Sequence, residues 1–234
     1  YNNGDLEAAE KVILAAQRPI ADGAGIEAER QIDLRNTMGR IYNASGRHTE
    51  ALEVRKKIMD WYLRVHGPNY MRTLSVQSNY AVSLSQFDRD GEAAELLQRT
   101  LPTRLKLLGP AHVEVGVHQV NLATSLRLLG QFAQARPLFV EGARIFREKL
   151  GPDNMRTLLV EAYVADVQTR LGEVEAGLER FRTTLAAFQR IDQGRSRWAL
   201  LARNDYAQAL VRAGQLERAG SQYTLIDEDR EQFA

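Results

Sequence analysis

The stretch from Phe146 to Leu158 reads FREKLGPDNMRTL, and related strings occur earlier as HGPNYMRTL from His66 and LGPAHVEVG from Leu108. Their glycines belong to a series whose members are 42 residues apart: Gly25, Gly67, Gly109 and Gly151. Glycine supplies the positive φ with which many helices end, and a following proline prevents the helix from continuing. The series therefore predicts one helix end in each repeat.

A second series of turn-forming residues keeps the same period: Gly4, Gly46, Asp88, Gly130, Gly172 and Gly214. Small residues follow it five positions later: Ala9, Ala51, Ala93, Ala135, Gly177 and Ala219. A fourth series is also small: Gly39, Ala81, Ala123, Ala165 and Ala207. Two ends in each repeat predict two helices of roughly 15 to 18 residues joined by short turns. The small residues mark predicted helix crossings, because a side chain larger than methyl would hold the axes apart.

The segments between these points are rich in Ala, Leu, Glu, Gln and Arg, with apolar residues at helical spacing such as Leu122, Leu126 and Leu129. No strand pattern competes with them. The sequence therefore predicts an all-α fold of antiparallel helix pairs. The helices are expected to begin near Asp5, Glu27, His48 and Met71, and at the same period as far as Gln215.

The repeats define the expected domain organisation, a single array over residues 1–234. It comprises a half repeat at 1–25, repeats at 26–67, 68–109, 110–151 and 152–194, and an atypical last repeat at 195–234. Tyr1 to Gly4 is expected to be the tail of a preceding helix, so that the chain is cut from a longer array. At 191–195 the string IDQGR replaces Leu-Gly-Pro, and we expect a kink there. The string DGAGIE at 22–27 indicates a loop and not a phosphate-binding motif.

Composition argues against several function classes. The 31 basic and 30 acidic residues give a net charge of +1, without a sequence-wide footprint for nucleic acid or an anionic membrane. No apolar run approaches the eighteen or so residues that cross a bilayer, so we expect no direct membrane contact. The absence of cysteine excludes disulfides, thiolate nucleophiles and Cys-ligated zinc. The compartment stays open: cytoplasmic, or periplasmic if the parent protein has an upstream membrane span.

Catalysis is not expected of this segment. Its four histidines form no HxxxH or HxxE pair that would place metal ligands on one helical face. Neither a Gly-x-Ser-x-Gly elbow nor a nucleotide-binding loop is present. We therefore expect no catalytic residue, no metal and no cofactor.

The string VNLATSLRLLGQFAQARPLF from Val120 to Phe139, together with the stretch from Phe146 to Leu158, resembles tetratricopeptide repeats of the kinesin light chain type. The resemblance extends over essentially all of the chain. It implies a right-handed α-solenoid whose first helices line a concave groove. It constrains function less, because the same scaffold carries motor adaptors, bacterial signalling proteins and assembly factors.

The resemblance also implies the groove positions. They project onto Asn36, Thr37, Arg40, Ser78, Asn79, Val82, Asn121, Thr124, Arg127, Tyr163, Asp166, Arg170, Asn204, Asp205, Gln208 and Arg212. Asn79 and Asn121 are equivalent, and a ladder of asparagines can pair with the backbone of an extended peptide because each side chain both donates and accepts. The alternative is that these amides bond to neighbouring helices or to water.

Arginine and tryptophan at this face each have two interpretations. The arginines either bind carboxylates or phosphates of a ligand, or they are solvated and paired at i, i+4. They are Arg40, Arg127, Arg170 and Arg212. Trp198 is either an aromatic anchor or a residue that fills space beside the altered hinge, which we favour. The clamp for chaperone tails is disfavoured, because its basic positions here carry Ser75, Val117 and Leu159.

These features favour a protein interaction module that binds a partner protein or extended peptide, with the partner along the first helices at Asn79, Asn121 and Arg127. Arrays resembling this one often follow a Ser/Thr protein kinase domain, so we expect a larger bacterial regulatory parent. The alternatives are a self-associating structural scaffold and a cargo adaptor for a motor. The oligomeric state stays open.

Overall fold

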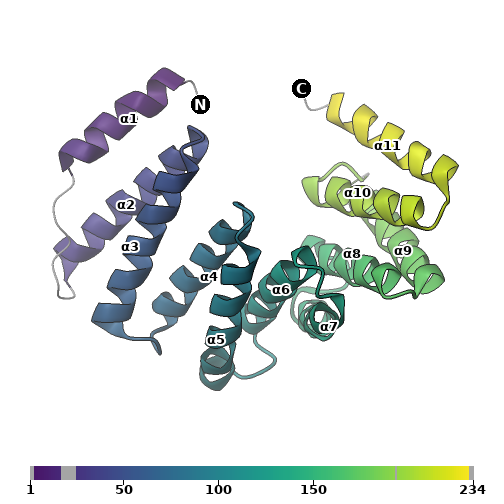
Figure 1. Ribbon diagram of the computed structural model, residues 1–234, viewed down its shortest axis with the longest axis horizontal. Helices are drawn as coiled ribbons and strands as arrows, with labels where there is room; N and C mark the ends of the chain where they lie inside the picture. The colour runs from purple at the N-terminus through teal and green to yellow at the C-terminus, as the bar shows by residue number, and fades with distance from the viewer. Residues whose placement is uncertain (1–2, 17–24, 193, 232–234) are drawn as a thin grey trace. The chain divides into compact units, whose positions relative to one another are not determined.

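The structure is a computed structural model that describes residues 3–16, 25–192 and 194–231. Within these ranges the chain forms eleven helices and no strand, which confirms the predicted all-α class (Figure 1). The helices are α1 (Asn3–Ala16), α2 (Ile26–Ala44), α3 (His48–His66), α4 (Met71–Ser85), α5 (Asp90–Leu108), α6 (Val113–Leu128), α7 (Phe132–Leu150), α8 (Met155–Arg170), α9 (Val174–Asp192), α10 (Arg197–Arg212) and α11 (Leu216–Glu231).

Helix starts recur along the chain. The first helices of successive repeats, α4, α6, α8 and α10, begin at Met71, Val113, Met155 and Arg197, and these starts are 42 residues apart. The second helices, α3, α5, α7, α9 and α11, keep the same spacing from His48 to Leu216. One expectation at the beginning was wrong: Asn3 and Gly4 belong to α1 and not to the tail of a preceding helix.

The turns between helices use the predicted glycines. Seven of them have φ between 73° and 97°: Gly46, Gly67, Gly109, Gly130, Gly151, Gly172 and Gly214. Asp88 takes the same left-handed conformation with φ of 58°, which a short polar side chain tolerates. Gly25 departs from the prediction, because its φ of 170° is extended and it precedes α2 as the N-cap. The predicted loop at Gly23 lies outside the described residues.

The chain divides into two compact units, residues 1–107 and residues 108–234. In the N-terminal unit one core cluster joins α1 to α2 through Leu6, Ile13 and Met38. A second cluster lies between α2 and α3 and contains Ile32 and Trp61, which are almost fully buried. Burying an aliphatic or aromatic side chain stabilises the fold by about 1.5–3 kcal/mol relative to leaving it exposed, so these clusters hold the helix pairs together.

The C-terminal unit has one extended core cluster across α8, α9, α10 and α11. Phe181 and Phe188 of α9 are fully buried, and the Phe181 ring lies 5.4 Å from that of Tyr206. Trp198 is partly buried and packs against this cluster, as the space-filling interpretation expects. Beside it, the backbone N–H of Gly194 donates to the carbonyl oxygen of Phe188. The kink at 191–195 stays a prediction, and Gln193 in that string lies outside the described residues.

Small residues occupy the helix crossings. Four members of the predicted series, Ala81, Ala123, Ala165 and Ala207, are wholly buried, and Gly39 is buried as well. Gly177 of α9 approaches its neighbour more closely than alanine would allow, since an added Cβ would lie 2.7 Å from the carbonyl oxygen of Ala165. The crossing of α8 and α9 is therefore tighter than the alanine of equivalent positions suggests.

Candidate binding groove

Three helices of the C-terminal unit, α6, α8 and α10, carry an ionic cluster centred on Asp166. The Asp166 side chain is 1% exposed, and its Oδ2 accepts a hydrogen bond from Arg127 Nη1 at 3.0 Å. Arg212 Nη2 of α10 donates to Asp166 Oδ1 at 2.7 Å. Arg170 Nε, one turn along α8, lies 3.1 Å from both carboxylate oxygens. One buried carboxylate thus ties three helices together.

The arginines of this cluster have further contacts that fix their positions. The Arg127 guanidinium lies 5.0 Å from the centre of the Tyr163 ring, and that of Arg170 lies 4.9 Å from the ring of Phe132. Such cation–π contacts contribute about 0.5–2 kcal/mol according to desolvation. Arg170 follows the predicted i, i+4 pairing, whereas Arg127 and Arg212 pair across helices. These contacts hold the three arginines, all of them predicted groove residues, in a defined array around Asp166.

Asp205 of α10 is the least compensated charge in the cluster. Its side chain is 15% exposed, and its Oδ2 lies 3.9 Å from Arg127 Nη1, near the limit of an ion pair. The pKa of Asp205 is raised to about 6, chiefly by burial; the attraction of Arg127 opposes this rise, and the nearby Asp166 carboxylate adds to it. Strongly perturbed carboxyl groups are concentrated at functional sites, and Asp205 is one of the residues predicted to line the groove.

This pKa predicts a pH dependence of folding. Between about pH 4 and pH 6 the unfolded chain has released a proton that folded Asp205 retains, so stability falls as the pH rises through this window. Asp205→Asn cannot ionise and should lose this decline. We expect the variant to gain about 1–3 kcal/mol relative to the wild type between pH 4 and pH 7. Urea unfolding at the two pH values measures the gain, and parallel stability curves would contradict it.

Two asparagines flank the ionic cluster. Asn121 of α6 and Asn204 of α10 are half-buried, and the side-chain amide of neither is hydrogen-bonded to a described residue. Thr124 Oγ1, by contrast, donates to the carbonyl oxygen of Val120 at 2.8 Å and is satisfied within its own helix. Gln208 is exposed on α10. Bonding to neighbouring helices, the alternative interpretation of the asparagines, therefore does not apply to Asn121.

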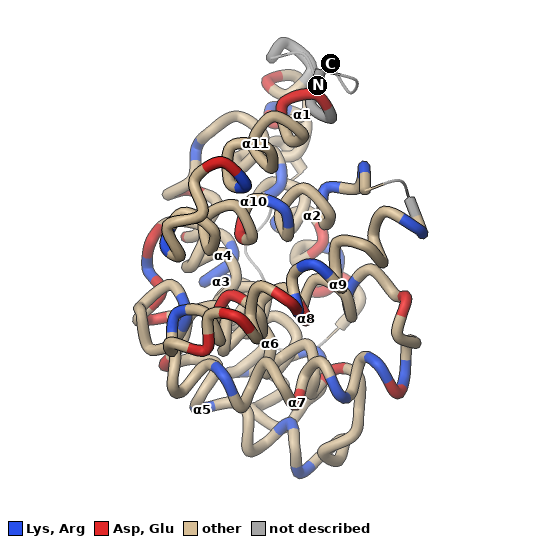
Figure 2. Tube along the Cα trace, turned by 90° about the vertical axis from the view of Figure 1, so that its right-hand side faces the viewer, with Lys and Arg blue, Asp and Glu red and all other residues tan. Residues whose placement is uncertain are grey.

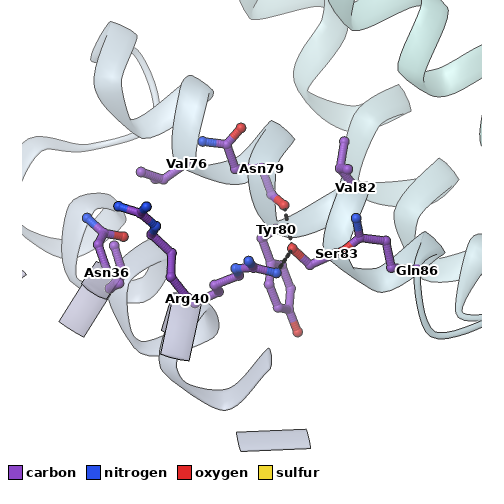
Figure 3. A pocket seen from close by; sticks show the side chains of 10 residues that line it. Asn36, Arg40, Val76, Asn79, Tyr80, Val82, Ser83 and Gln86 are labelled. Carbon is purple, nitrogen blue, oxygen red and sulfur yellow. Dashed lines mark hydrogen bonds between the residues drawn. The ribbon is translucent and has the colours of Figure 1, made fainter. Parts of the chain in front are cut away.

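The N-terminal unit has a separate pocket of about 460 Å³ between α2, α3 and α4. It is lined by Asn36, Arg40, Arg55, Ile58, Val76, Asn79, Tyr80, Val82, Ser83 and Gln86. Figure 3 shows Asn36 and Arg40 of α2 facing Val76 and Asn79 of α4. Four of the six predicted groove residues of this unit, Asn36, Arg40, Asn79 and Val82, thus line one pocket, and all four are exposed.

Comparison with known proteins identifies the repeats. A family model described as "Tetratricopeptide repeat" matches residues 30–106, and another of the same description matches residues 118–154. The three helix pairs α2–α3, α4–α5 and α6–α7 lie largely within these matches. These two segments of the chain carry tetratricopeptide repeats.

Solved structures similar to these tetratricopeptide repeats share the fold at low sequence identity. A putative kinesin light chain with nearly identical TPR-like repeats from Podosopora anserina has a TM-score of 0.72 at 19% identity, covering 87% of this chain and 96% of that one. BtubC (BKLC) from P. vanneervenii has a TM-score of 0.68 at 16% identity, covering 97% and 87%. These likenesses show the fold alone.

A curated relative shares the repeats as part of a much longer protein. It is the clustered mitochondria protein homolog of Candida albicans, which is 25% identical over 166 residues. The alignment covers 70% of this chain and 12% of the relative, so the chain spans a small part of that protein. Tetratricopeptide repeats generally mediate protein–protein interaction, and their fold is typically non-catalytic.

Neither a metal-binding group nor a membrane-spanning helix is found in the described ranges. They hold no group of three or more His, Asp or Glu residues that could bind a metal ion. None of their helices is long and apolar enough to cross a membrane. Figure 2 shows basic and acidic residues interspersed along the helices, in agreement with the near-zero net charge.

Arg55 lines this pocket but is not among the groove residues predicted from the sequence. It lies on α3, a second helix, whereas the groove was predicted only from first helices. Arg55 stands out when equivalent positions of the repeats are compared. Four of these positions carry buried apolar residues: Ile13, Leu97, Phe139 and Phe181. An arginine at a position that is buried and apolar in other repeats is therefore a sequence signal of a candidate site residue.

Proposed function

We propose that this chain is an interaction module that binds a partner protein or an extended peptide along the groove face of its first helices. The half-buried amides of Asn121 and Asn204 carry the proposal, because neither bonds to a described residue. Both side chains are partly exposed, and an extended peptide backbone offers a donor and an acceptor with which each amide can pair.

The ionic cluster supports this function by holding the groove rigid. Asp166 connects α6, α8 and α10, and α6 and α10 carry the two asparagines. A face that is already ordered loses less conformational entropy when a peptide binds, so more of the contact energy appears as affinity. Asp205, whose charge is poorly compensated, adds a place where a basic side chain of the peptide would be stabilised.

The first binding prediction concerns Asn121. A hydrogen bond is worth about 0.5–1.5 kcal/mol net, so Asn121→Ala should weaken the binding of a peptide selected against this chain by roughly three- to tenfold. The double variant Asn121→Ala with Asn204→Ala should weaken it further and leave folding intact. Peptides from a random display library, measured by isothermal titration calorimetry, provide the readout.

The matched control is Arg182→Ala on α9, whose side chain is half-exposed and pairs with Glu179. This variant should bind the selected peptide as the wild type does. If the double asparagine variant retains wild-type affinity for every selected peptide, binding through this groove face is wrong. If Arg182→Ala on α9 weakens binding and the double asparagine variant does not, the peptide binds at α9 and not at the predicted groove positions.

We further propose that the module is the sensor or scaffold part of a larger bacterial regulatory protein with a Ser/Thr kinase-like domain. The support is the resemblance of the repeats to arrays found beside such domains, and the test is the coding sequence upstream of Tyr1. A self-associating scaffold is the alternative, and light scattering over a concentration series separates the two. A strictly monomeric chain would exclude the scaffold. A motor-type cargo adaptor stays a third candidate.

A further inference from the structure

The pocket of the N-terminal unit is unusual in its charge. It is lined by the guanidinium groups of Arg40 and Arg55, and none of its described lining residues is acidic. Arg40 forms no ion pair with a described residue. In the C-terminal unit, by contrast, Arg127 and Arg212 form ion pairs with Asp166.

Arg55 is held in place inside this pocket by neutral groups, and it forms no ion pair with a described residue. Its Nη1 donates to Ser83 Oγ, a bond drawn in Figure 3, and its Nη2 lies 2.6 Å from the side-chain oxygen of Asn43 in the amide orientation that satisfies both groups. Burial lowers the pKa of Arg55, because the charged form is desolvated and neutral groups compensate it only in part. A charge in this state favours an anionic ligand.

The polar groups around the two arginines suit a ligand rich in acceptors. The amides of Asn36, Asn79 and Gln86 are not hydrogen-bonded to described residues and each can donate. The Ser83 hydroxyl is already used, since it accepts from Arg55 and donates to the Asn79 carbonyl oxygen at 2.8 Å. An anion with several unprotonated oxygens matches this set of donors.

The charge of the pocket distinguishes between two anionic groups that a partner protein can offer, a carboxylate and a phosphate monoester. A carboxylate brings one negative charge and two oxygens, which would leave one of the two guanidinium charges uncompensated. A phosphate monoester brings about −1.5 to −2 charges and three acceptor oxygens, which is sufficient for both arginines and the amides. The apolar floor of Ile58, Val76 and Val82 then accommodates the neighbouring part of the chain that carries the phosphate.

We propose that this pocket binds a phosphorylated serine or threonine side chain in an extended segment of a partner protein, with Arg40 and Arg55 sharing the phosphate. This site is separate from the proposed binding face of the C-terminal unit, because it lies wholly in the N-terminal unit. It also requires a specific modification of the partner, a phosphorylated side chain. It would make recognition by the N-terminal unit dependent on a kinase.

The experiment compares three degenerate nonapeptide libraries on beads whose central residue is phosphoserine, serine or glutamate. The fluorescently labelled full chain should be retained at least tenfold more by the phosphoserine library than by the other two. Arg40→Ala and Arg55→Leu should each reduce this retention at least tenfold. Arg55→Leu introduces the residue that Leu97 provides at the equivalent position, so it is compatible with the repeat.

The control is Arg99→Ala on α5, an exposed arginine of the same unit that lies outside the pocket lining; its retention should equal that of the wild type. Circular dichroism melting verifies the fold, and if Arg55→Leu does not fold, the exposed Arg40→Ala decides. Equal retention by the glutamate or serine library would overturn the proposal. So would binding of the chain to phosphoinositide vesicles, measured in parallel, without retention by the phosphoserine library. A negative result for phosphoserine binding would not contradict the prediction for Asn121. The two proposed sites are therefore tested independently.

Discussion

Replacing Asp166 by Asn should lower the free energy of unfolding by about 3–5 kcal/mol, because it leaves three guanidinium groups around a buried position without their common counter-ion. Asn keeps the size of the side chain but turns an amide NH₂ toward groups that are themselves donors. For a unit of this size the loss corresponds to a fall in melting temperature of roughly 10–20 °C. Differential scanning calorimetry measures it.

Two further variants show whether charge is the cause. Glu179→Gln removes an exposed partner of Arg182 and should change stability by no more than about 0.5 kcal/mol. Adding Arg212→Ala to Asp166→Asn should recover part of the loss, since one uncompensated cation is removed with the carboxylate. If Asp166→Asn melts within 2–3 °C of the wild type, roughly the effect of less than 1 kcal/mol, the cluster does not stabilise the unit.

Enlarging Ala123 to Leu should be the second most damaging change. Ala123 is wholly buried on α6, where the predicted series places a helix crossing. The additional methylene and methyl groups must force the helices apart or take unfavourable rotamers, at a cost of about 1–3 kcal/mol. Urea unfolding followed by circular dichroism provides the measurement.

The matched control for this change is Ala133→Leu on α7, where the alanine is exposed. Leucine is nearly as good a helix former as alanine, so this variant should unfold like the wild type. A wild-type midpoint for Ala123→Leu would mean that the crossing can accommodate a large side chain and that the assigned repeat register is wrong.

Much of the fold was predictable because its signals are local and repeated. Gly46 and Gly130 end their helices through their own backbone conformation, which does not depend on distant contacts. Ala81 and Ala165 recur because the same crossing recurs in each repeat. Gly25 was predicted wrongly, since the register was extended to a place where the Leu-Gly-Pro string is absent.

The candidate site was predictable only as a set of positions. The register placed Arg127, Asp166 and Arg212 on one face, but it gave no reason to expect that one carboxylate would bind three arginines across helices. Asp166 was projected as a groove residue, and it is instead 1% exposed and functions as the internal counter-ion. Residues far apart in sequence can be paired only once the helices are packed.

By itself, the sequence determined where helices begin and end and which small residues lie between them, because backbone conformation and repeat spacing are properties of short segments. Only the tertiary structure decided the charge state and the accessibility of the site. The pKa of Asp205 depends on burial and on Asp166 from another helix, and the pocket at Arg55 depends on the approach of α2, α3 and α4. Desolvation and through-space electrostatics act between residues that the order of the chain does not bring together.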